Sequence, residues 1–123
     1  METSAHILVA ASHENFRTTI CRILSRCGYQ TDVVASGEDA VQALEQRPYD
    51  LVLTEMALPG ICGLTVLCRS RQEGRQVPFV LLTECQTERA RWVMSGMDAV
   101  RCLSLPLNVD RLKHVVAESI AAA

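Results

Sequence analysis

Residues 49–63 read YDLVLTEMALPGICG. In this stretch an apolar run, Leu51–Leu53, leads to a carboxylate at Glu55 and then to a turn that contains Pro59 and Gly60. The pattern is typical of a buried strand that delivers a charged side chain to a loop. In open α/β sheets, ligands and chemistry collect at the carboxyl ends of the strands. Glu55 is therefore the first candidate functional residue of the chain.

Length and composition predict one globular domain, residues 1–123. The chain is 49% hydrophobic and 21% charged, which is typical of a folded protein with a buried core. Its formal net charge of −2 gives no basis for a nucleic-acid surface. No apolar run reaches the roughly 18 residues that span a bilayer, and residues 1–6 lack the pattern of a signal peptide. We therefore expect a cytoplasmic location, without direct contact to nucleic acid or membrane.

The cysteines show no metal-binding or redox motif. They stand at Cys21, Cys27, Cys62, Cys68, Cys85 and Cys102. No pair has the Cys-x-x-Cys spacing, and no histidine stands at metal-ligand distance along the sequence. We expect most of them to be small buried hydrophobic residues. Cys85 is the best candidate for a reactive thiol, if it is exposed.

The remaining sequence alternates strand and helix patterns. Strands are predicted at 7–10, 29–35, 50–54, 77–83 and 100–104. Helices are predicted after the capping residues Ser12, Ser36 and Asn108, and over 64–72 and 87–97. This alternation with short connections predicts a parallel sheet with helices on both faces. The strand at 100–104 mixes polar and apolar residues and is a candidate edge strand.

Several motifs occur in an order that belongs to a known family. They are Ile7-Leu8-Val9, Tyr49-Asp50-Leu51-Val52-Leu53, Leu58-Pro59-Gly60, Gly63-Leu64, Val80-Leu81-Leu82-Thr83 and Leu105-Pro106. From Ile7 to Ile120 the chain resembles the receiver domains of two-component response regulators. The resemblance implies a single flavodoxin-like (βα)5 domain whose five-stranded parallel sheet has the order 2-1-3-4-5.

The resemblance also implies a phosphorylation site whose residues have changed. In the family an aspartate after the third strand accepts a phosphoryl group from a histidine kinase, two acidic residues hold Mg²⁺, a Ser or Thr binds the phosphoryl group, and a lysine precedes a proline. The matching positions are Glu55 for the acceptor, Ala11 and Ser12 for the acidic pair, Thr83 for the hydroxyl, Leu105 for the lysine and Cys102 for the switch aromatic. Only the hydroxyl is retained.

These changes predict a pseudo-receiver. Ala11 and Ser12 supply no carboxylate oxygen to a hard cation. Without metal and lysine, most of the positioning and charge stabilisation of phosphoryl transfer is missing. We expect no Mg²⁺ or other cofactor, no catalytic residue and no enzyme activity, but a signalling module that binds a protein partner such as a histidine kinase or an output domain. The alternatives are a receiver that still accepts a phosphoryl group on Glu55 and, less favoured, a flavodoxin-like ligand-binding or redox module.

Two roles remain open for Glu55. Its carboxylate stands in for phospho-aspartate and accepts a hydrogen bond from Thr83, or it is a solvated carboxylate paired with His13 or a backbone amide. Leu105 is expected to place an apolar side chain over the phosphoryl pocket, and the Leu105–Pro106 peptide bond is a candidate cis bond.

The fourth helix, fifth strand and fifth helix form a candidate partner or homodimer face. The residues are Arg89, Arg91, Trp92, Arg101, Lys113 and Glu118. Mixed charges with an aromatic residue suit a protein interface, although a solvated face has the same composition.

Counting back from Pro106 without gaps puts Asp98, rather than Gly96, where the family has a glycine.

Overall fold

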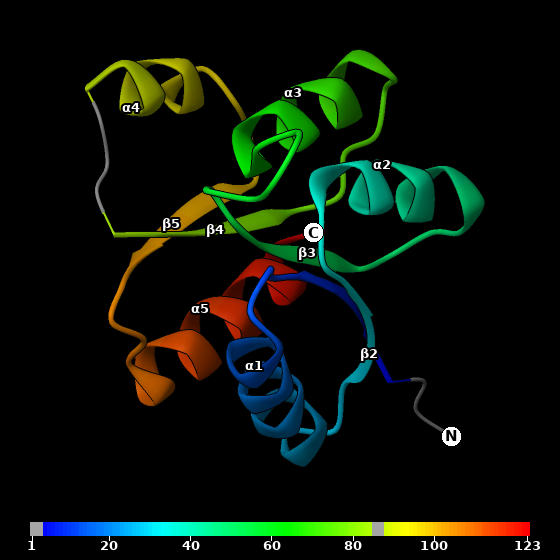
Figure 1. Cartoon of the computed structure of the whole chain (residues 1–123), viewed down its shortest axis with the longest axis vertical. Helices are drawn as coiled ribbons and strands as arrows, with labels where there is room; N and C mark the ends of the chain where they lie inside the picture. The colour runs from blue at the N-terminus through cyan, green and yellow to red at the C-terminus, as the bar shows by residue number, and fades with distance from the viewer. Residues whose placement is uncertain (1–3, 85–87) are drawn as a thin grey trace.

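The computed structural model describes residues 4–84 and 88–123 and consists of one five-stranded parallel sheet between two helical layers (Figure 1). The strands are β1 (His6–Ala10), β2 (Gln30–Val34), β3 (Leu51–Glu55), β4 (Phe79–Thr83) and β5 (Val100–Ser104). The helices are α1 (Glu14–Arg26), α2 (Gly37–Gln46), α3 (Gly63–Gln72), α4 (Glu88–Ser95) and α5 (Val109–Ala122). The sheet order β2-β1-β3-β4-β5 confirms the predicted order and the edge position of β5.

Alternate residues of the inner strands feed two separate cores. Ile7 and Val9 of β1 pack with α1 and α5 on one face, and Leu8 and Ala10 pack with α2, α3 and α4 on the other. Figure 1 shows these two helical layers below and above the sheet. The inner strands are covered on both faces, which is why they appear in the sequence as continuous apolar runs.

Two of the three predicted helix caps are present. The Ser36 side chain accepts a hydrogen bond from the Asp39 amide at 3.2 Å, and the Asn108 side chain accepts one from the Arg111 amide at 3.0 Å. The prediction for Ser12 is wrong: α1 begins at Glu14, and its N-cap residue is His13, whose side chain makes no capping bond. The Ser12 amide and hydroxyl instead face the carboxylate of Glu55.

The bounds of β3 and β4 differ from the predicted ones. β4 starts at Phe79 rather than at Val77, because Pro78 has no amide hydrogen and the Val77 carbonyl accepts a bond from Arg71 at 2.8 Å. β3 extends through Glu55, which pairs in register with Leu82 of β4. This candidate residue therefore occupies the last position of the central strand.

Gly63 allows α3 to start against the end of β3. A Cβ atom at this position would lie 2.3 Å from the Glu55 carbonyl oxygen. The Gly63 amide also donates to the Met56 carbonyl at 2.8 Å. The glycine therefore fixes the turn that follows the candidate residue.

The cysteines are less buried than predicted. Cys21, Cys62, Cys68 and Cys102 are half-buried, and Cys27 is exposed because it follows the last turn of α1. All of these thiols are free. Cys85 and Thr87, the predicted first residue of the fourth helix, lie outside the described residues. Within the described ranges, no helix is long and apolar enough to cross a membrane.

Candidate functional site

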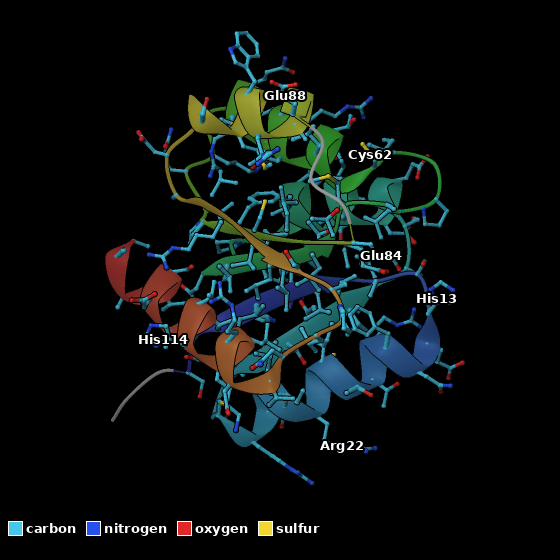
Figure 2. All side chains as sticks on the ribbon, turned by 90° about the vertical axis from the view of Figure 1, so that its left-hand side faces the viewer. His13, Arg22, Cys62, Glu84, Glu88 and His114 are labelled. Carbon is cyan, nitrogen blue, oxygen red and sulfur yellow. The ribbon has the colours of Figure 1, made fainter. Side chains whose placement is uncertain are left out.

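A cleft of about 370 Å³ lies at the carboxyl edge of the sheet. It is lined by Ser12, His13, Glu55, Ala57, Leu82, Thr83, Glu84 and Leu105. These residues come from the loops that follow β1, from the ends of β3 and β4, and from the segment after β5. Figure 2 labels His13 and Glu84 on the same side of the molecule. The fold thus brings together most of the site residues that the sequence predicted.

Glu55 is held by hydrogen bonds from Ser12. Its Oε1 atom accepts a hydrogen bond from the Ser12 backbone amide at 2.8 Å, and the Ser12 hydroxyl lies 3.4 Å from the same oxygen. The His13 Nδ1 atom lies 3.3 Å from the Ser12 hydroxyl. Of the pairings considered for Glu55, the backbone amide is the one observed. Ser12 therefore serves the cleft rather than the helix.

Thr83 closes the opposite wall of the cleft. It is the last residue of β4 and is only 8% exposed. Its carbonyl accepts a bond from the Leu105 amide at 2.8 Å, which ties the end of β4 to the segment after β5. Thr83 and Glu55 share the cleft, and a hydrogen bond between their side chains stays a prediction.

Leu105 contributes an apolar side chain to the cleft wall. It is half-buried, lines the cleft and also packs against the core beneath α1 and α5. The peptide bond between Leu105 and Pro106 is cis, the geometry expected from the sequence. The wall at this point offers neither charge nor hydrogen-bonding groups from a side chain.

Ala11 lies behind the cleft with its methyl group fully buried. Its amide donates to the Val34 carbonyl at 3.1 Å, and its carbonyl accepts from Arg17 Nη1 at 2.9 Å. Arg17 was not singled out from the sequence, where nothing distinguishes it from other helix arginines. Glu84 was also missed, although its position directly after Thr83 was a usable signal. Arg17 fixes the loop that carries Ser12.

The family model described as "Response regulator receiver domain" matches residues 7–117. The chain belongs to this family. It is 34% identical over 113 residues to the sensor histidine kinase RcsC of Salmonella typhi. The matched region is 90% of this chain and 12% of that protein. The chain is 32% identical over 112 residues to the transcriptional regulatory protein TcrA of Mycobacterium tuberculosis, which covers 89% of this chain and 44% of that protein.

A solved receiver domain shares the fold closely. The receiver domain of the sensor histidine kinase PA1611 from Pseudomonas aeruginosa superposes with a TM-score of 0.84 at 28% identity, over 97% of this chain and 99% of that one. That structure has a magnesium ion coordinated in its active-site cleft. The chain thus matches a complete receiver domain but spans a small part of RcsC and less than half of TcrA.

In this receiver domain, Cys102 lies behind the cleft rather than in it. Its thiol is half-buried and lies 3.5 Å from the Met94 sulfur on α4. Burial raises the pKa of Cys102, so the thiol stays neutral near neutral pH. The position predicted for a switch aromatic is thus filled by a small neutral group of the core beneath α4.

On the α4–β5–α5 face of the receiver domain, one of the basic side chains is paired with a carboxylate of the same face. Trp92 is 77% exposed, and Arg91 and Lys113 are also exposed. Arg101, however, donates to Glu118 at 2.7 Å, and this bond is the main reason that the pKa of Glu118 is lowered. The side chain of Arg89 lies outside the described atoms. The role of this face as an interface stays a prediction.

A second carboxylate, missed in the sequence, lies in the middle of the edge strand β2 and contacts residues near the amino ends of β1 and β3. The Asp32 Oδ2 atom accepts from the Tyr49 hydroxyl at 2.7 Å and lies 3.1 Å from His6 Nε2 and 3.2 Å from Arg47 Nη1. The Tyr49 hydrogen bond is the main cause that lowers the pKa of Asp32. Burial, followed by Asp32 itself, raises the pKa of Tyr49 to about 12. This network ties β1, β2 and the segment before β3 together.

Proposed function

We propose that this receiver domain signals by binding a protein partner without a phosphorylation cycle and without enzyme activity. One observation carries the proposal. The Glu55 carboxylate, at the position of the phosphoryl acceptor, already accepts the Ser12 backbone amide at 2.8 Å. The cleft thus holds a negative charge in a defined place in the unmodified protein.

The residues around Glu55 do not fit a magnesium ion. Mg²⁺ requires oxygen ligands in a nearly ideal octahedral arrangement. At the two positions expected for the acidic pair, Ala11 presents a buried methyl group, and the backbone amide of Ser12 is a hydrogen-bond donor that faces Glu55. Among the described residues, no three His, Cys, Asp or Glu side chains gather closely enough to hold a metal. We therefore propose that this cleft does not bind magnesium as the cleft of the PA1611 receiver domain does.

The charges of the cleft also oppose phosphoryl transfer. Glu55 and Glu84 both line it, and Leu105 occupies the place expected for a lysine. A phosphoryl donor carries negative charge that must be offset in the transition state. Among the described residues that line the cleft, His13 is the one side chain that can carry a positive charge, and it is opposed by two carboxylates.

We propose that the partner is a histidine kinase or an output domain of a two-component pathway. The likeness to RcsC, a sensor histidine kinase, and to TcrA, a transcriptional regulatory protein, supports these classes. A cytoplasmic location follows from such partners. The α4–β5–α5 face is proposed as the contact surface, including a homodimer through the same face, because Trp92 stands exposed there.

Partner capture from a lysate of the source organism tests the proposal. The wild-type chain is used as bait with a metal chelator present and, separately, with a small phosphodonor and Mg²⁺. We expect the same partner in equal amount in both conditions. A partner that binds only after addition of phosphodonor and Mg²⁺ would overturn the proposal. Glu55→Gln, with Glu84→Gln as the matched control, then shows whether the partner recognises the Glu55 charge.

A further inference from the structure

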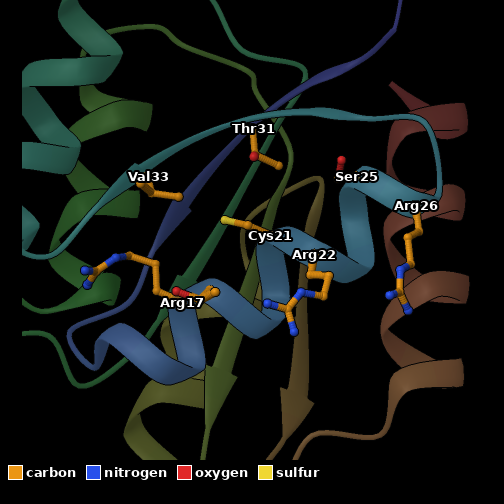
Figure 3. A pocket seen from close by; sticks show the side chains of 8 residues that line it. Arg17, Cys21, Arg22, Ser25, Arg26, Thr31 and Val33 are labelled. Atoms are coloured by element: carbon orange, nitrogen blue, oxygen red, sulfur yellow. The ribbon is translucent and has the colours of Figure 1, made fainter.

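A second groove of the described surface lies between α1 and the edge strand β2, away from the cleft. It has a volume of about 590 Å³. Figure 3 shows the side chains that line it: Arg17, Thr18, Cys21, Arg22, Ser25, Arg26, Thr31 and Val33. Three of these residues are arginines and none is acidic. The groove is therefore cationic on a chain whose formal net charge is −2.

No carboxylate among the described residues forms an ion pair with the arginines of the groove. Arg22 and Arg26 are exposed and form none of the ion pairs found among the described residues. Arg17 donates to a backbone carbonyl rather than to a carboxylate. Burial raises the pKa of the Cys21 thiol, so this group adds no negative charge at neutral pH. The groove thus offers charge complementarity to an acidic partner.

The floor of the groove has free backbone groups. Among the described strands β2 pairs only with β1, so the outer edge of β2 is open. The Gln30 amide bonds to the Ala5 carbonyl and the Val34 carbonyl accepts from Ala11, so even-numbered residues of β2 face β1. In a parallel strand the intervening residues, Thr31 and Val33, direct their amides and carbonyls to the other side. The side chains of these two residues line the groove, and Val33 is 48% exposed.

The spacing of the arginines suits an extended peptide. Arg22 and Arg26 are one helical turn apart, which corresponds to about 6 Å along the helix axis. Alternate side chains of a strand on one face are spaced by about 6.6 Å. A peptide paired with the open edge of β2 would therefore present alternate side chains to α1 at nearly the spacing of the arginines. Arg17 lies five residues before Arg22, about 140° around the helix, and adds positive charge at the other flank of the groove (Figure 3).

We propose that the α1–β2 groove binds an extended acidic segment of a protein partner, which pairs with the edge of β2 and places alternate carboxylates against Arg22 and Arg26. Backbone pairing at Thr31 and Val33 provides the affinity that is common to strand addition. The arginines provide the preference for acidic side chains. This site goes beyond the cleft function and does not depend on the state of Glu55.

A blocked peptide of the sequence Thr-Glu-Val-Glu-Val-Glu-Thr is the probe. Titration into the labelled protein, followed by amide chemical shifts, should give saturable changes at residues 17–33 that weaken as salt increases. On binding, the amides of Thr31 and Val33 should become protected from hydrogen exchange. The same peptide with Gln in place of Glu should bind at least about tenfold more weakly, because it lacks the charge.

Charge reversal separates this site from general attraction. Arg22→Glu with Arg26→Glu should reduce affinity for the acidic peptide at least about tenfold. The matched control, Arg69→Glu on α3 with Arg111→Glu on α5, changes two exposed arginines outside the groove. It makes the same change in net charge and should leave binding within about twofold. Equal binding of the Gln peptide, equal loss in the control variant, or unprotected Thr31 and Val33 amides would each overturn the proposal. Tighter binding of a single-stranded polynucleotide at the same residues would overturn it in favour of a nucleic-acid site.

Discussion

Two carboxylates of the sheet have different surroundings. Asp32, in the middle of the edge strand β2, accepts the Tyr49 hydroxyl and lies within 3.2 Å of nitrogen atoms of both His6 and Arg47. Glu55, at the carboxyl end of the central strand β3, is held by the uncharged amide and hydroxyl of Ser12. Asp32 thus has a guanidinium as a neighbour, whereas the bonds to Glu55 position its charge without neutralising it.

The difference separates a structural acid from a candidate signalling acid. A carboxylate with several donors stabilises the fold, and its loss leaves those donors unpaired. A carboxylate held by one good hydrogen bond at the rim of an open cleft contributes less to stability, and its charge remains available to a partner.

Removal of Asp32 should have the largest effect. Asp32→Ala takes the acceptor from the half-buried Tyr49 hydroxyl and the counter-charge from Arg47. We expect the free energy of unfolding in urea to fall by about 2 kcal/mol, a value that allows for solvent screening of the ion pairs. Glu45→Ala, which removes an exposed carboxylate of α2, is the control and should stay within about 0.5 kcal/mol of wild type. Equal losses in the two variants would remove the distinction.

Tyr49 should report the same network at high pH. In a Tyr29→Phe background Tyr49 is the remaining tyrosine, and its absorbance should titrate with a pKa of about 12. Because this pKa lies above the unfolded value of about 10, Tyr49 contributes stability that is complete below pH 10 and is lost as the pH rises through 12. In Asp32→Ala the pKa should decrease yet stay raised, since burial is the first cause. A wild-type pKa at the ordinary value would contradict the network.

The isosteric pair Asp32→Asn and Glu55→Gln gives the smallest effects. Gln at position 55 retains an oxygen that accepts from the Ser12 amide, so stability should change by less than about 0.5 kcal/mol. Asp32→Asn loses the charge that attracts the Arg47 guanidinium and strengthens the Tyr49 hydrogen bond, and it should destabilise by about 1 kcal/mol. Both values come from urea unfolding. A Glu55→Gln loss as large as that of Asp32→Asn would mean that Glu55 is a structural carboxylate too.

The sequence predicted features that depend on local or repeated patterns. The apolar runs of the inner strands gave the sheet and, with the family resemblance, its order. Ser36 and Asn108 were recognised as caps because their bonds reach three residues along the chain. Ser12 was predicted as a cap on the same kind of signal, but its bonds go to Glu55, 43 residues away. No local pattern contains that contact.

The same reason explains the residues that were missed. Asp32 gathers partners from positions 6, 47 and 49, which become neighbours only when β1, β2 and the segment before β3 are assembled. The basic groove likewise joins α1 to the edge of β2. The cleft residues could be predicted because the family motifs mark each strand end. Their hydrogen bonds could not, because these depend on the turn taken by single residues such as Ser12.

Intact mass spectrometry after incubation with acetyl phosphate and Mg²⁺ tests the central claim most directly. The variant with Ala11→Asp, Ser12→Asp, Glu55→Asp and Leu105→Lys restores the acidic pair, the acceptor and the lysine, and it serves as the positive control. We predict that this variant gains the mass of one phosphoryl group, whereas the wild-type mass does not change. A stoichiometric phosphoryl adduct on Glu55 of the wild-type protein would contradict the account.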